Sequence, residues 1–133
     1  MDVSSVLVAV GGEQCDDHVV RLACELLNSN KDKLYILYVI EVDRGLPVDA
    51  EVASATAKAE EVLGRMEEVA RSRKFKTEGE LVQARQAGSA VVREAFDKKV
   101  DAIVLGIPYR ERYGSFIMGE TAPYVLENAP CRV

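Results

Sequence analysis

The sequence predicts an α/β fold, a single doubly wound domain over residues 1–133 with helices on both faces of an open, mostly parallel sheet. Short, continuously apolar runs alternate with longer segments whose apolar residues recur at helical spacing. Such runs are typical of parallel strands covered on both faces, and right-handed crossovers place the helices on either side. We expect five strands in the order 3-2-1-4-5, with the fifth truncated.

The first half of the chain alternates two strands with two helices. The run VLVAV at 6–10 predicts the first strand, and Asp16 or Asp17 is positioned to cap the helix that follows. The run LYILYVI at 34–40 predicts the second strand. A polar loop then leads to one long helix over 49–73, with a single apolar stripe backed by a charged face.

The second half repeats the alternation. A strand within 75–83 is polar in its first half, which favours a place at or near an edge of the sheet. Ser89 is the expected cap of the next helix, which Lys98 and Lys99 close. A buried strand at 102–105, a final helix broken by Pro130, and the first step of a fifth strand at 131–133 complete the pattern.

The loop after the buried strand at 102–105 is the candidate functional element. Gly106 ends the strand, Arg110 and Arg112 follow, and Gly114 and Gly119 precede the final helix. A strand, a glycine-bearing loop and a helix start are how α/β proteins make an anion site, because first-turn amides lack partners within the helix. Ligands bind beyond the carboxyl ends of the strands in such sheets.

Several stretches together resemble the universal stress protein family, over essentially the whole chain. VLVAVGG at 6–12 and LYILYVIEV at 34–42 are similar to that family's first two strands. DAIVLG at 101–106 and MGETAPYVLENAPCRV at 118–133 are similar to its fourth strand, final helix and the start of its fifth strand. The resemblance implies the doubly wound fold, an adenine-nucleotide cleft and a homodimer paired through the fifth strands.

Many members of that family bind ATP through the pattern G-x2-G-x9-G-[S/T]. Gly106 and Gly119 match its first and third glycines, whereas Tyr109 and Glu120 replace the second glycine and the Ser/Thr. Gly11 stands where ATP-binding members usually carry an Asp. The resemblance therefore implies a degenerate ATP motif.

Each replacement has a physical consequence for a bound phosphate. The ring of Tyr109 hinders close approach, and the Glu120 carboxylate repels a phosphate and is expected to occupy the amides of the helix N-terminus. Arg110 and Arg112 supply two cations at the same mouth, unless they are solvated or paired with nearby carboxylates. The candidate nucleotide-binding residues are Val10, Gly11, Val39, Gly106, Arg110, Arg112, Gly114, Ser115, Gly119, Glu120 and Thr121.

Composition narrows the class of protein. The net charge of −5 disfavours extended contact with nucleic acid or anionic lipid, and no apolar run approaches the roughly 20 residues that cross a bilayer. The N-terminus lacks the basic start of a signal peptide. Three cysteines without a CxxC pair suit a reducing compartment, so we expect a cytoplasmic protein without membrane insertion.

The sequence offers little for catalysis. His18 is the only histidine, so neither a Ser-His-Asp triad nor a histidine metal cluster can be built, and GxxxxGK[ST] is absent. The leading hypothesis is a regulatory binding module that holds ATP or another adenine nucleotide, with or without Mg²⁺. The alternatives are a weak ATP hydrolase that uses Glu120, and a non-nucleotide protein-interaction domain fused to a transporter.

Overall fold

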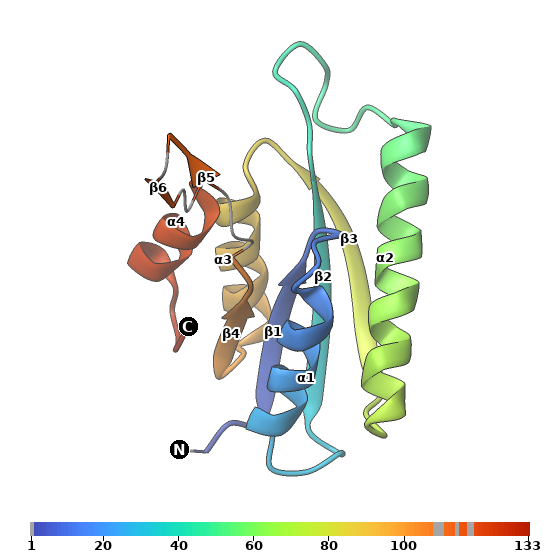
Figure 1. Ribbon diagram of the computed structural model, residues 1–133, viewed down its shortest axis with the longest axis vertical. Helices are drawn as coiled ribbons and strands as arrows, with labels where there is room; N and C mark the ends of the chain where they lie inside the picture. The colour runs from blue at the N-terminus through green and yellow to red at the C-terminus, as the bar shows by residue number, and fades with distance from the viewer. Residues whose placement is uncertain (1, 108–110, 114, 117–118) are drawn as a thin grey trace.

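The computed structural model describes residues 2–107, 111–113, 115–116 and 119–133, and contains a parallel sheet with helices on both faces (Figure 1). The strands of the sheet are β1 (Ser5–Val10), β2 (Lys33–Glu41), β3 (Thr77–Ala84) and β4 (Ala102–Leu105). The helices are α1 (Asp16–Leu26), α2 (Ala53–Ser72), α3 (Ala87–Lys98) and α4 (Thr121–Asn128). The doubly wound α/β prediction is thereby confirmed.

Two apolar cores lie on opposite faces of the sheet. Alternate residues of β2 face opposite ways, so Leu34 and Ile36 pack with α1 and α2 while Tyr35 and Leu37 pack with α3 and α4. Figure 1 shows α1 and α2 in front of and beside the sheet and α3 behind it. Burial on both faces explains why the strand is continuously apolar in sequence rather than alternating.

The sheet order is β3-β2-β1-β4, which confirms four of the five predicted positions. The prediction of five strands is wrong. Among the described residues, the expected fifth strand amounts to one parallel bridge between Ala102 and Arg132, in which the Ile103 N–H donates to the Arg132 carbonyl at 2.8 Å. A single bridge does not continue into the repeated ladder of hydrogen bonds that defines a strand.

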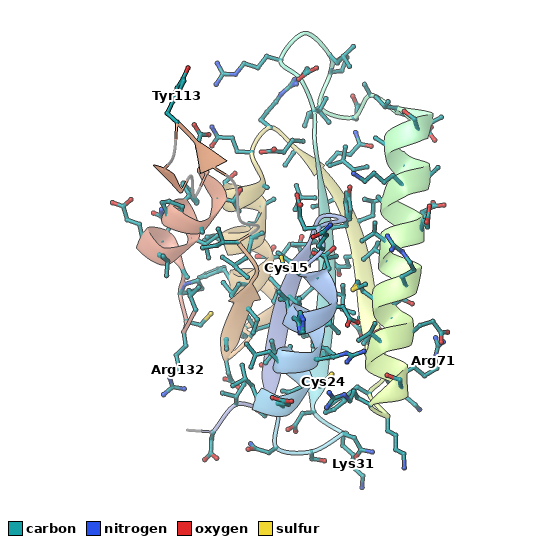
Figure 2. The ribbon with its side chains drawn as sticks, viewed as in Figure 1. Cys15, Cys24, Lys31, Arg71, Tyr113 and Arg132 are labelled. Atoms are coloured by element: carbon teal, nitrogen blue, oxygen red, sulfur yellow. The ribbon has the colours of Figure 1, made fainter. Side chains whose placement is uncertain are left out.

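The loop after β4 contains a short antiparallel pair that the sequence analysis did not predict. It consists of β5 (Glu111–Arg112) and β6 (Ser115–Phe116), with Glu111 paired to Phe116 and Arg112 to Ser115. Tyr113 lies in the connection with a φ of 54° and projects away from the domain (Figure 2).

The predicted edge position of β3 is confirmed, because β3 pairs only with β2 among the described strands. Two helix starts differ from prediction. The helix expected from 49 begins at Ala53, because a turn in which the Ala50 N–H donates to the Pro47 carbonyl precedes it. Ser89 lies inside α3 rather than at its cap, and its hydroxyl donates to the Gln86 carbonyl at 3.1 Å.

Helices α2 and α3 end in the same way, on a lysine in the left-handed conformation. Lys74 has a φ of 67° and Lys99 a φ of 54°. Lys74 and Phe75 donate backbone hydrogen bonds back into α2, and Lys99 and Val100 do the same into α3. Glycine is usually favoured at this position because it has no Cβ to strain. Closure of α3 at Lys98 and Lys99 confirms the prediction.

In the part of the chain that the structure describes, no helix has the length and apolar character needed to span a bilayer.

Candidate functional site

A cleft of about 380 Å³ lies beyond the carboxyl ends of β1, β2 and β4. Seven of the predicted site residues line it, namely Val10, Gly11, Val39, Gly106, Gly119, Glu120 and Thr121. They come from three strand ends and the start of α4, segments that are far apart in the sequence. The chain runs from β1 to β2 and β3 on one side of β1 and then crosses to β4 on its other side. The strand order therefore reverses between β1 and β4, which is where open α/β sheets bind ligands.

Four predicted site residues remain untested. Arg110 and Gly114 lie outside the described residues, as does Tyr109. Arg112 and Ser115 lie on β5 and β6, where the backbone is described and the side chains are not.

Gly106 has a packing role at the floor of the cleft. A Cβ atom at this position would lie 2.6 Å from Val19 Cγ2 and 2.7 Å from Cys15 Sγ, both on the first turn of α1. The end of β4 therefore approaches α1 more closely than any larger residue allows. Gly119 differs, since a Cβ there would meet nothing within 4 Å, but its φ of 79° favours glycine.

Cys15 and His18 carry no chemistry that the site could use. Cys15 is half-buried, and burial together with the neighbouring Asp16 charge raises the pKa of its thiol. A raised pKa leaves less of the reactive thiolate at neutral pH. His18 is exposed on α1, as a solvated residue would be.

Asp16 organises the loop between β1 and α1. Its side chain is only 5% exposed, and Oδ2 accepts hydrogen bonds from the backbone N–H of Gly12 at 2.8 Å and of Glu13 at 3.1 Å. Burial raises the pKa of Asp16 even though these amide hydrogen bonds act in the opposite direction. The sequence indicated a helix cap here, but the carboxylate bonds backward into the loop and makes no capping bond within α1.

Glu41, the last residue of β2, contacts the start of α3 on another wall of the cleft. Its Oε2 accepts a hydrogen bond from the Ala87 N–H, the first amide of α3, at 2.9 Å. This contact was missed because nothing in the sequence spacing relates the end of the second strand to a helix 46 residues later. Glu41 thereby pairs one of the amides that a helix N-terminus leaves without a partner in the helix.

The first amides of α4 have no acceptor among the described residues. Glu120 is the N-cap residue and is exposed, but its side chain makes no capping hydrogen bond, so the prediction that it occupies the amides is wrong. Pro123 has no N–H, and the Tyr124 N–H already donates to the Glu120 carbonyl at 3.2 Å. The amides of Thr121 and Ala122 are left without acceptors inside the helix.

The charged side chains in the described lining of the cleft are all acidic. Glu13, Asp16, Glu41 and Glu120 are its charged side chains, and no lysine or arginine is among the described lining residues. The rest includes side chains from the strand ends, such as Val39. No group of three or more His, Cys, Asp or Glu residues in the described ranges is placed to hold a metal ion.

A parallel sheet of this order defines a doubly wound α/β domain, and its cleft lies at the switch point where such sheets bind ligands. The universal stress protein family model matches residues 3–133, and the chain belongs to this family. No curated protein sequence matches the chain.

Solved structures share the fold. A universal stress protein from Archaeoglobus fulgidus is similar with a TM-score of 0.80 and 20% identity over 100% of this chain and 97% of that one. A complex of the Archaeoglobus fulgidus protein with dAMP has a TM-score of 0.76 and 21% identity, with the same coverage. A family member from Arabidopsis thaliana with AMP bound has a TM-score of 0.68 and 15% identity over 98% of this chain and 88% of that one.

Asp16→Asn and Asp16→Ala separate the two effects of this carboxylate. Asn keeps an oxygen that accepts from the Gly12 and Glu13 amides and removes the buried charge, so we expect a free energy of unfolding at least equal to that of the parent at pH 7. Ala leaves both amides without that acceptor and should cost about 1–3 kcal/mol. Urea unfolding measures both.

The difference in stability between the parent and Asp16→Asn should depend on pH. Because the pKa of Asp16 is raised in the folded state, its ionised form opposes folding, and that penalty is relieved as pH falls through the raised pKa. The parent should therefore gain stability relative to Asp16→Asn between pH 7 and the usual aspartate range. Equal stability of the Ala and Asn variants at pH 7 would contradict the role given to the hydrogen bonds.

Proposed function

We propose that this protein is a regulatory binding module whose cleft holds an adenine nucleotide, with the monophosphate favoured over ATP. The observation that carries the proposal is that seven residues chosen from sequence line one cleft at the switch point of the sheet. Its volume of about 380 Å³ falls in the range of small-molecule sites, roughly 300–1,000 Å³. Solved relatives described as bound to dAMP, cAMP and AMP support the ligand class.

The start of α4 is the proposed phosphate contact. Thr121 and Ala122 offer amides that no acceptor within the helix uses, and the helix dipole favours an anion there. The base and ribose would lie against Val10, Gly11 and Val39, on the side of the cleft formed by β1 and β2. The loop amides of Gly12 and Glu13 are already taken by Asp16 and do not contribute.

The preference for a monophosphate follows from the charge of the described lining. Two like charges 4 Å apart repel by about 4 kcal/mol at an effective dielectric constant of 20, and by less when solvent screens them. Glu120 stands beside the proposed phosphate contact, so every further phosphate adds repulsion. Arg110, Arg112 and a Mg²⁺ ion brought by ATP would offset this repulsion, with Gly114 and Ser115 as further backbone contacts.

We propose binding rather than hydrolysis as the activity, in a cytoplasmic protein. Hydrolysis would require a held metal ion and a group that orients water, and Glu120 is the one residue we assign as a candidate for either role. The protein-interaction alternative, with no nucleotide bound, is the outcome expected if the titration below gives no heat.

Isothermal titration with AMP, ADP and ATP, with and without Mg²⁺, tests the proposal. We expect AMP to bind more tightly than ATP without Mg²⁺. Glu120→Gln should raise ATP affinity by about threefold, since one nearby charge is worth up to about 1 kcal/mol at a partly exposed site. Glu127→Gln, on the same helix but outside the cleft, should change nothing. No heat from any nucleotide in folded protein rules out nucleotide binding.

We also propose that the protein forms a homodimer across the side of β4 that faces away from β1, where Arg132 makes the one bridge described. An apolar groove of about 400 Å³ runs along β4 between α1 and α4. It is lined by exposed Leu22 and Leu126, which are 49% and 61% exposed, and by Leu26 and Val133. A strand edge beside exposed apolar side chains tends to recruit another chain, and a second copy offers the same groove.

Light scattering during size-exclusion chromatography tests the dimer. The parent should elute at twice the mass of one chain, and Leu126→Glu should elute as a monomer because it places a charge in the apolar contact. Phe96→Glu is the matched control, since Phe96 is 68% exposed on α3 and lies outside the groove. A monomeric parent, or equal effects of both substitutions, would count against this interface.

A further inference from the structure

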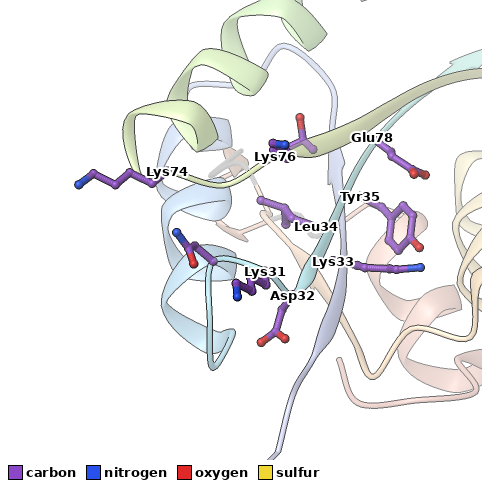
Figure 3. Close-up of a pocket in the computed structure, with 10 residues that line it drawn as sticks. Lys31, Asp32, Lys33, Leu34, Tyr35, Lys74, Lys76 and Glu78 are labelled. Carbon is purple, nitrogen blue, oxygen red and sulfur yellow. The ribbon is translucent and has the colours of Figure 1, made fainter.

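A second hollow, of about 510 Å³, lies at the opposite end of the sheet from the cleft, beside the amino ends of β2 and β3 (Figure 3). The segment before β2 contributes Lys31 and Lys33, and the segment before β3 contributes Lys74 and Lys76. The pairing of Leu34 with Thr77 brings these two connections side by side. All four lysines are exposed.

The positive charge of this hollow is not neutralised within the described part of the protein. None of its four lysines has an ion-pair partner among the described residues, whereas nearby Arg71 pairs with Glu68. Figure 2 shows Lys31 and Arg71 at the same end of the molecule. The lining also contains Asp32 and Glu78, so the lysines outnumber the carboxylates in a protein whose net charge is −5.

One of those two carboxylates is engaged in the local turn. Asp32 Oδ2 accepts hydrogen bonds from the backbone N–H of Asn28 at 2.9 Å and of Ser29 at 3.0 Å. The Asp32 carboxylate therefore stabilises the turn before β2 as well as lining the hollow. Glu78 is the other carboxylate, and Figure 3 shows it on β3 beside Tyr35.

Lys74 stands at the rim in a conformation that disfavours a side chain. Its φ of 67° is set by backbone hydrogen bonds from Lys74 to the Arg71 carbonyl at 2.8 Å and from Phe75 to the Ala70 carbonyl at 3.0 Å. A glycine would fit this turn with less strain. Lys99 has the same conformation at the end of α3, so the two lysines differ in their place relative to the hollow and not in backbone strain.

We propose that this hollow binds a small polyanion of the oligophosphate class, at a site separate from the nucleotide cleft. Figure 3 shows Lys33 and Lys74 extended away from the other lining side chains, so binding would require these exposed side chains to turn inward. Lysine ammonium groups on flexible stems suit phosphate as mobile point charges. The concave shape favours a small molecule over a flat lipid surface. A free oligophosphate and the phosphate chain of a nucleotide share this chemistry.

Titration with inorganic tripolyphosphate at low salt tests the site. Lys74→Gly removes one cation while relieving backbone strain, so we expect affinity to fall by at least about fivefold while the melting temperature rises. Lys99→Gly is the matched control, because it makes the same charge and backbone change at the end of α3, outside the hollow. It should raise the melting temperature and leave affinity unchanged.

Several outcomes would overturn the proposal. These are no binding of tripolyphosphate to the parent, or equal effects of the two glycine variants on affinity. Displacement of tripolyphosphate by AMP would show that the two ligands share one site. Tighter, Lys74-dependent binding of single-stranded DNA would assign the lysines to a nucleic acid instead. By contrast, ATP that loses affinity in Lys74→Gly while AMP does not would support the proposal and identify the phosphate chain of a nucleotide as the polyanion.

Discussion

The close approach of β4 to the first turn of α1 is the constraint on which the site depends. It is possible only because residue 106 is glycine, since a Cβ there would overlap Val19 and Cys15. Asp16, one residue further along the same turn, draws the β1 loop back through two amide hydrogen bonds. Together these contacts hold two loops close to α1, and the cleft lies beyond the strand ends that they frame.

The same contacts determine which donors remain for a ligand. Amides of the β1 loop are used by Asp16, and the first amide of α3 is used by Glu41. Among the described residues, the amides of Thr121 and Ala122 at the start of α4 have no acceptor. With carboxylates as the charged groups of the described lining, this arrangement suits one phosphate group better than a chain of three. The lysine hollow at the other end gives the domain a marked charge polarity.

The parts of the fold that depend on local pattern were predictable. Continuously apolar runs located β1, β2 and β4, and the polar start of β3 indicated its edge position. The prediction of a fifth strand failed because a few residues carry no sequence signal for how many backbone pairs they form with a neighbouring strand. Here they form one bridge. Single residues whose partners lie far away, such as Glu41 with Ala87, have no signature in sequence spacing.

The candidate site was predictable to the extent that glycines and strand ends mark it. Gly106 and Gly119 identified the cleft, but the reason for Gly106 is packing against α1, which no motif contains. A carboxylate before a helix indicates a cap, and Asp16 and Glu120 show two other behaviours. Asp16 accepts hydrogen bonds from the loop that precedes it, and Glu120 makes no hydrogen bond to the amides of α4. The conformation of each loop decides which amides its carboxylate can reach.

The central claim is that the cleft at the strand ends is a nucleotide site. Amide chemical shifts of ¹⁵N-labelled protein during titration with AMP test it most directly. We predict saturable shifts at Gly11, Gly119 and Thr121, with Lys31 and Thr77 at the far end unchanged. Shifts confined to the far end, or spread evenly over both ends, would contradict the account.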